Sequence, residues 1–415
     1  MEVWLRMIRV GLIGYGTVGS GVYERLHRAK ELENILGDHI EVKAILVKDR
    51  QKQRATQTEV NVTTDWEQFC LTADYDVIFE MIGGVEPAYS YTTYWLKKGV
   101  PVFTANKKLV AEKGKELENI ASQANTYYGY EASVAGGIPI VNILKATLST
   151  TTISRVFGIL NGTTNYILTE MTKHNRSLTE ALTDAEQKGY AESDPSDDLD
   201  GYDSWYKIRI LSRLCFGDWS TSLQFSRKGI SDIEDWHVEI GNKFGFSIKL
   251  IAEAYRHVNT TVGGVYPAFL CQSEQLNYVN GVTNGVFIEG EHVGQLLFIG
   301  PGAGKEATAN SMVEDFQFHH RIVKWERSFS STVLHEHPYK HLLVCLTHEE
   351  REHALDWVKE TGCEVLDTFT HHEGEGWIIP LRNQMEVPFP FYPIYGDVSL
   401  RKRVKELYSA QFGSI

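Results

Sequence analysis

Apolar runs and helical spacings alternate along the first 148 residues of the chain. Almost continuous apolar runs are typical of strands buried on both faces of a parallel sheet, whereas apolar residues three or four positions apart indicate helices. Val18, Val22 and Leu26 have this helical spacing directly after the first run. The predicted strands lie at residues 7–13, 42–47, 75–82 and 100–104, with a further one beginning near 127. We therefore expect an α/β domain with a doubly wound parallel sheet at residues 1–148.

The pattern changes between residues 149 and 325. A strand is expected at 154–160, and Ser177-Leu178-Thr179-Glu180 has the form of a capping box that opens a helix. Residues 255–300 alternate between apolar and polar positions and contain Asn-Gly and Glu-Gly turn signals, which predict antiparallel strands. We expect residues 149–325 to form a second, mixed α/β domain whose last helix packs back on the first domain.

A glycine motif follows the first predicted strand. Gly14, Gly16 and Gly19 form a GxGxxG between a strand and a helix, which is the context that dinucleotide binding requires. The first glycine permits a tight turn, the second lets a pyrophosphate approach the backbone, and the third lets helix and strand pack closely. In this context we favour a Rossmann-type dinucleotide site over a simple glycine-rich turn.

The end of the second predicted strand bears on the choice of cofactor. An acid there usually holds the ribose of NAD, whereas basic residues pair with the 2′-phosphate of NADP. Lys48 and Arg50 favour NADP, Asp49 keeps NAD open, and all three would also suit a solvated loop.

Residues 189–207 hold six carboxylates and one lysine. A helix is expected to start near Asp200, so Asp203 and Lys207 lie four residues apart on one face. An exposed helix pair has the same spacing. A calcium loop is excluded, because in that register Lys207 occupies the position of the bidentate glutamate. Lys107 follows the strand at 100–104, where ligands of open parallel sheets bind, although a surface lysine would look the same.

Composition narrows the class of protein. The net charge of −13 disfavours nucleic acid and anionic membrane surfaces as partners. The five cysteines are scattered, which fits neither a disulfide framework nor a zinc site and suits a reducing, cytoplasmic setting. No apolar run reaches the length of about 18 residues that a membrane span needs.

Several long motifs occur together in one order. They are Gly14–Gly19, Thr104–Lys107, Glu131–Pro139, Gly158–Asn165, Gly189–Lys207 and Gly300–Gly304. In these motifs and their order the chain resembles the homoserine dehydrogenase family over roughly residues 7–320. The resemblance implies NAD(P)-dependent interconversion of L-homoserine and L-aspartate 4-semialdehyde, on the route to threonine, methionine and isoleucine. It also implies a homodimer formed through the middle domain.

The resemblance assigns roles to individual residues. Lys207 takes the position of the proton donor, with Lys107 and Asp203 as the other catalytic groups. The implied substrate-binding residues are Gly189, Tyr190, Glu192, Asp198 and Asp203. The expected cofactor-binding residues are Gly14, Gly16, Thr17, Val18, Gly19, Lys48, Arg50, Thr104, Lys107 and Gly302. A structural sodium site is implied at Glu131, Val134, Gly136 and Ile138.

The sequence departs from the family pattern at two places. Ser204-Trp205-Tyr206 is bulky where the family has small residues. Residues 326–415 have a βαββα order that resembles an ACT regulatory domain, with strands at 340–346, 364–369 and 376–381 and helices at 349–359 and 401–408. The Asp-x-Pro-Gly effector turn is missing, so we expect a degenerate module with weak or absent threonine feedback.

Two other functions compete with homoserine dehydrogenase. One is another Rossmann dehydrogenase acting on a small amino acid or semialdehyde. The other is a non-catalytic NADP-binding sensor, which would have no use for Lys107, Asp203 and Lys207.

Overall fold

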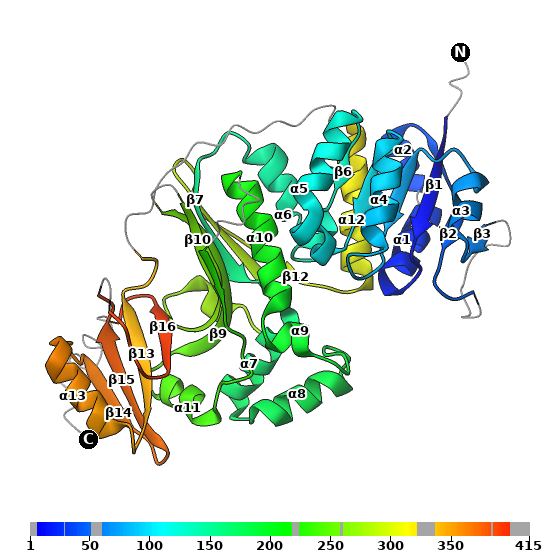
Figure 1. Cartoon of the computed structure of the whole chain (residues 1–415). Helices are drawn as coiled ribbons and strands as arrows, with labels where there is room; N and C mark the ends of the chain where they lie inside the picture. The colour runs from blue at the N-terminus through cyan, green and yellow to red at the C-terminus, as the bar shows by residue number, and fades with distance from the viewer. Residues whose placement is uncertain are drawn as a thin grey trace.

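The computed structural model describes residues 6–28, 30–50, 60–217, 224–257, 260–321, 337–382 and 385–398. Figure 1 shows a first domain in blue and cyan, a middle region in green, and a C-terminal module in orange and red. The boundaries 1–148, 149–325 and 326–415 stay predictions. The predicted helix at 401–408 lies outside the described residues.

The first domain is built on a six-stranded sheet in the order β3-β2-β1-β4-β5-β6, in which all neighbouring strands are parallel. This is the strand order of a dinucleotide-binding fold, and it confirms the predicted Rossmann-type sheet. The strands are β1 (Met7–Ile13), β2 (His39–Leu46), β3 (Asn61–Thr63), β4 (Val77–Glu80), β5 (Val102–Thr104) and β6 (Tyr128–Gly129). The helices are α1 (Thr17–His27), α2 (Lys30–Leu36), α3 (Trp66–Thr72), α4 (Ala88–Lys97) and α5 (Lys107–Gln123).

Helix α12 (Lys305–Arg321) comes late in the chain but lies against the first domain (Figure 1). Met312 and Phe316 of this helix belong to the same buried cluster as Val10 of β1 and Val22 of α1. The contact with α1 is close, because a side chain at Gly21 would lie 2.9 Å from the Cβ of Ala309. The middle region is therefore connected to the first domain at both of its ends.

The middle region contains a mixed sheet with helices packed on one face. The antiparallel strands are β7 (Ile153–Ile159), β9 (Ser247–His257), β10 (Thr260–Leu270), β11 (Thr283–Gly290) and β12 (Gly294–Pro301), and β8 (Gln224–Arg227) pairs parallel to β10. The helices are α7 (Gly162–His174), α8 (Leu178–Gln187), α9 (Ser196–Leu199), α10 (Tyr202–Phe216) and α11 (Asp235–Lys243). Short elements are η1 (Glu131–Ser133), α6 (Ile140–Asn142), η2 (Ile143–Thr147) and η3 (Gln275–Tyr278). The expected capping box is present at α8, where Ser177 and Glu180 exchange both hydrogen bonds.

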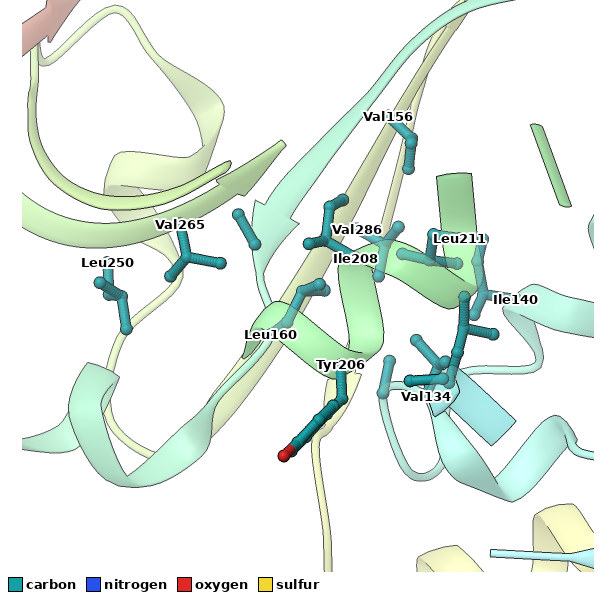
Figure 2. Close-up of a cluster of buried hydrophobic side chains, with 14 of the residues drawn as sticks. Val134, Ile140, Val156, Leu160, Tyr206, Ile208, Leu211, Leu250, Val265 and Val286 are labelled. Atoms are coloured by element: carbon teal, nitrogen blue, oxygen red, sulfur yellow. The ribbon is translucent and has the colours of Figure 1, made fainter. Parts of the chain in front are cut away.

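Helix α10 runs through the centre of this region. Ile208 and Leu211 point into a cluster that includes Val156 of β7 and Val286 of β11 (Figure 2). A helix that is buried on several faces has little freedom to shift, because protein cores are close-packed. The packing of α10 therefore also fixes the position of the polar side chains at its amino end.

The C-terminal module contains β13 (His341–Thr347), α13 (Arg351–Thr361), β14 (Asp367–Thr370), β15 (Gly374–Pro380) and β16 (Phe391–Tyr395). The first four lie where the sequence pattern predicts them, and the ACT-like assignment stays a prediction. The sequence did not predict β16, because its prolines are atypical of strands. This strand pairs parallel to β10 at Phe269–Ile394 and antiparallel to β13, so the module and the middle region share one ten-stranded sheet.

Candidate active site

A cavity of about 660 Å³ lies between the first domain and the middle region. It is lined by the start of α5, the start of α7, the acidic stretch before α10, and the glycine segment that follows β12. The predicted site residues among its lining are Lys107, Gly189, Tyr190, Glu192, Asp198, Asp203, Lys207 and Gly302. The fold thus gathers segments that are far apart in the sequence around one space.

Lys207 is buried on the first half of α10. Its Nζ donates to the backbone oxygen of Leu160 at 2.7 Å and to Oδ2 of Asp203 at 2.6 Å. Burial lowers the pKa of Lys207; Asp203 opposes this change and the nearby Lys107 adds to it. A lysine with a lowered pKa gives up its proton more readily than a free one, which suits general acid chemistry.

Asp203 is the centre of the site, because both lysines meet on it. Lys107 pairs with Oδ1 and Lys207 with Oδ2. Burial alone would raise the pKa of Asp203, but the two ammonium groups lower it well below its usual range. The carboxylate therefore stays ionised and fixes one lysine from each side of the cavity.

The two lysines differ in exposure. The side chain of Lys107 is 41% exposed, whereas that of Lys207 is 9% exposed. The charge of Asp203 raises the pKa of Lys107, against the effect of burial. The site therefore combines an accessible, firmly charged ammonium with a buried one whose proton is more labile.

Asn161, which the sequence reasoning did not single out, completes this cluster. Its Nδ2 donates to Asp198 at 2.6 Å and to Asp203 at 2.8 Å. Its Oδ1 accepts the backbone N–H of Thr164 at 2.8 Å and so caps α7. The available signal was its position between a predicted strand and a helix, where an asparagine is a preferred cap.

The acidic stretch supplies part of the cavity lining. Asp198 is partly buried, and burial followed by the charge of Asp203 raises its pKa. Glu192 is exposed at the rim, and the backbone oxygen of Tyr190 accepts the hydroxyl of Thr163 at 2.7 Å. Residues Ser196–Leu199, just before the helix expected from near Asp200, form the short helix α9.

The glycine motif has the geometry that its sequence predicts. Gly14 has φ +105°, and a Cβ there would lie 2.8 Å from the backbone oxygen of Met81. Gly16 faces open space, whereas a Cβ on Gly19 would come within 2.5 Å of the backbone oxygen of Gly14. Only the middle glycine thus leaves room for an approaching group, and Thr17 and Val18 begin the helix behind it.

The end of β2 and Gly302 hold other predicted cofactor positions. The N–H of Gly14 donates to the backbone oxygen of Leu46 at 2.8 Å, so the loop contacts the end of β2, and the exposed Lys48 and Arg50 follow directly. At Gly302, a Cβ would lie 2.2 Å from the side chain of Asn284, so this position needs glycine.

The predicted sodium ligands lie at the junction of the domains. Glu131 is completely buried and accepts the N–H groups of Val141 at 3.0 Å and Asn142 at 2.6 Å. Burial, with a smaller effect from Asp315, raises its pKa to about 8. The backbone oxygen of Gly136 accepts the Ser311 hydroxyl at 2.6 Å. Within the described part of the chain, no group of three or more His, Cys, Asp or Glu side chains is placed to bind a metal.

The structure also bears on the expectation about membranes. None of the helices in the described residues is long and apolar enough to cross a bilayer.

Comparison with known proteins identifies the family. Residues 14–131 match the model for the homoserine dehydrogenase NAD-binding domain, and residues 139–316 match that for homoserine dehydrogenase. The homoserine dehydrogenase of Lactococcus lactis is 38% identical over 324 residues, which cover 77% of this chain and 75% of that protein. That of Bacillus subtilis is 40% identical over 314 residues, covering 75% and 72%.

Solved structures show the same likeness. A homoserine dehydrogenase from Thiobacillus denitrificans matches with a TM-score of 0.82 at 27% identity, over 95% of this chain and 99% of that one. A hyperthermophilic archaeal homoserine dehydrogenase in complex with NADPH matches with a TM-score of 0.64 at 25% identity, over 76% and 97%. Because of this similarity in sequence and structure, the chain belongs to the homoserine dehydrogenase family, whose members are NAD(P)-dependent oxidoreductases acting on a CH–OH group.

Proposed function

We propose that Lys107, Asp203 and Lys207 carry out the proton chemistry of homoserine dehydrogenase in this cavity. The observation that carries the proposal is the meeting of two lysines, one from each domain, on the two oxygens of one buried carboxylate. A surface helix pair would not place a third charged group there, and a sensor would not need one. The alternative functions therefore have less support than catalysis.

The proposed roles follow from the chemistry of aldehyde reduction. A bound nicotinamide dinucleotide supplies the hydride for the aldehyde carbon of L-aspartate 4-semialdehyde. The carbonyl oxygen then gains negative charge and needs a proton and a nearby cation. Lys207 delivers the proton to that oxygen, Lys107 stabilises the charge, and Asp203 keeps both ammonium groups in place. In the reverse direction Lys207 accepts the hydroxyl proton of L-homoserine.

The acidic wall accounts for recognition of an amino acid. The substrate carries an α-ammonium group, and Glu192 and Asp198 line the same cavity as Lys107. The loop of Gly189 and Tyr190 holds Glu192 at the rim. We assign these residues to substrate binding.

The cofactor is proposed to be NADP rather than NAD. Lys48 and Arg50 are exposed directly after β2, where a 2′-phosphate would lie if a dinucleotide bound at Gly14, Gly16 and Gly19. Thr104 and Gly302 complete the proposed set from β5 and from the segment before α12. The double variant Lys48→Ala/Arg50→Ala should raise the KM for NADP at least tenfold and leave that for NAD within twofold.

The oxygens of Glu131, Val134, Gly136 and Ile138 suit a hard monovalent cation, and we propose a structural sodium site there. Bound sodium would restore the charge of the buried Glu131 carboxyl and fix the turn between the domains. We also propose a homodimer formed through the middle sheet. Light scattering of the purified protein tests the dimer.

The reaction is tested by absorbance at 340 nm with purified protein and L-homoserine, with NADP and NAD in parallel. Reduction of the dinucleotide with homoserine, and none with serine or threonine, is the expected result. Folded protein that binds NADP but reduces neither cofactor would overturn the assignment and favour the sensor. Reduction with another small amino alcohol instead would favour a different dehydrogenase.

A further inference from the structure

Glu80 is a buried acid that the proposed mechanism does not use. It is the last residue of β4 and is 0% exposed. Its Oε1 accepts the N–H of Ile82 at 2.7 Å, and its Oε2 accepts the hydroxyl of Thr104 at the end of β5. These hydrogen bonds offset part of the cost of burying the carboxyl, and they fix it between the ends of β4 and β5.

The hydrogen bonds continue from Thr104 into α5. The Thr104 hydroxyl oxygen accepts the N–H of Asn106 at 2.9 Å. The Asn106 side chain donates to the backbone oxygens of Ile82 at 2.8 Å and Gly84 at 2.6 Å, and it accepts the N–H of Leu109 at 3.1 Å. Asn106 is thus the cap of α5 and the link between the ends of β4 and β5.

The residue after this cap is Lys107, the first of α5. The path from Glu80 to Lys107 therefore consists of two hydrogen bonds and one peptide link. Lys107 reaches across the cavity to Asp203, which lies on the other side of the domain junction. A small shift at the end of β5 would move this ammonium relative to the substrate, and misplacement by about 1 Å can cost about a hundredfold in rate.

We propose that Glu80 is a positioning residue that sets the place of the Lys107 ammonium through Thr104 and Asn106. This inference rests on the proposed role of Lys107. Glu80 is not among the residues that line the cavity, so it acts on the reaction through these neighbours.

The protonation of Glu80 should make the position of Lys107 depend on pH. Burial raises its pKa to about 7, against the hydrogen bonds from Thr104, Ile82 and Asn106. When the carboxyl takes up a proton, it turns from an acceptor into a donor towards Thr104. The hydroxyl of Tyr128 on β6 is a titratable group close to Glu80, whose charge helps to raise the pKa of Tyr128, and Lys107 is a titratable group along the hydrogen-bonded path. Positioning through Glu80 should therefore change near neutral pH.

The test is a double-variant cycle on the full-length protein. Glu80→Gln, which keeps the shape of the side chain, and Glu80→Asp, which keeps the charge, are each measured alone and together with Lys107→Ala. The control is Glu116→Gln, because Glu116 is an exposed acid on α5 paired with Lys113. The readouts are kcat, the KM for homoserine, the Kd for NADP and the pH profile of kcat.

We expect Glu80→Gln to lower kcat about tenfold, to leave the Kd for NADP within twofold, and to remove an inflection of kcat near pH 7. In the Lys107→Ala background it should change kcat less than twofold, and Glu80→Asp should retain the inflection. Independent, multiplicative effects of the two substitutions would overturn the positioning role. A Lys107→Ala variant with normal kcat would instead refute the proposed function of Lys107.

Discussion

Two cavities of nearly equal size differ in how their buried charges are arranged. The active-site cavity measures about 660 Å³. The second, of about 620 Å³, lies between the middle sheet and the C-terminal module and is called the junction cavity. Its residues include Arg155, which pairs with Glu253 at 2.9 Å and with Glu289 at 3.6 Å.

The origin and the chemistry of the charges distinguish the two cavities. Arg155 and Glu289 line the junction cavity, and with Glu253, the other partner of Arg155, they come from the neighbouring strands β7, β11 and β9. A guanidinium cannot release its proton in a protein. That of Arg155 also stacks on Phe157, with its Cζ 3.7 Å from the centroid of the ring. In the active site, two lysines from different domains share Asp203. The two cavities are thus similar in volume but differ in whether their buried cations can release a proton.

Replacing Lys207 should have the largest effect on the reaction. Lys207→Ala should lower kcat about a thousandfold, since the proposed general acid is lost, while NADP still binds. Stopped-flow fluorescence of NADPH binding and steady-state kinetics measure the two effects. Lys188→Ala is the control, because Lys188 forms a pair of the same spacing with Asp184 but is 48% exposed. Turnover retained in Lys207→Ala would remove Lys207 from the mechanism.

Replacing Arg155 tests the other cavity. Arg155→Met leaves the buried Glu253 without its cation, which should cost about 3 kcal/mol in the free energy of unfolding. The kcat of the folded enzyme should stay within twofold, because the pair has no part in the reaction. Urea unfolding and kinetics measure both. Arg176→Met, which removes a 40% exposed arginine, should cost less than about 1 kcal/mol. A large loss of kcat without loss of stability would show that the junction cavity is functional.

Lys249 is a third buried cation to set beside Lys207 and Arg155. Its Nζ donates to Asn165 and to Asn280 at 3.0 Å and to the backbone oxygen of Val279 at 2.7 Å. Burial, with a smaller effect from Lys173, lowers its pKa to about 7. Between about pH 7 and 10, Lys249 is protonated in the unfolded chain but has lost its proton in the folded chain. The free energy of unfolding should therefore rise with pH by up to about 1.4 kcal/mol per unit over this range, and not below it.

This contribution should be missing from Lys249→Met. Chemical unfolding of the variant and of the wild type at pH 7, 8 and 9 measures the difference in slope. Lys359→Met is the control, since Lys359 is 74% exposed, and it should keep the wild-type slope. Equal slopes for Lys249→Met and the wild type would mean that Lys249 stays charged when folded.

The smallest expected effect concerns threonine. Because the module lacks the expected effector turn, millimolar L-threonine should change the rate by less than twofold. The full-length protein must be used, since removing the module would unpair β10 from β16. Strong inhibition by threonine would show that the module binds an effector despite its sequence.

The sequence predicted the individual site residues better than the contacts between them. The helical spacing placed Asp203 and Lys207 on one face, and the end of β5 placed Lys107 at the ligand-binding edge of the sheet. The ion pair between Lys107 and Asp203 depends on how two domains pack, which local periodicity does not encode. Asn161 was missed for the same reason, because its partners Asp198 and Asp203 come from a distant segment. Strand β16 was missed because prolines hid a strand that tertiary pairing stabilises.

The pairing of β16 with β10 also has a consequence for synthesis on the ribosome. One half of β10 is paired with β8, and Phe269 and Leu270 in its other half pair with residues of β16. Domains fold in order as the chain emerges, and an unpaired strand edge is a site of aggregation until it is covered. The sheet of the middle region therefore keeps an open edge until residues 391–395 have left the exit tunnel. Strand β16 thus decides when the central sheet can be completed.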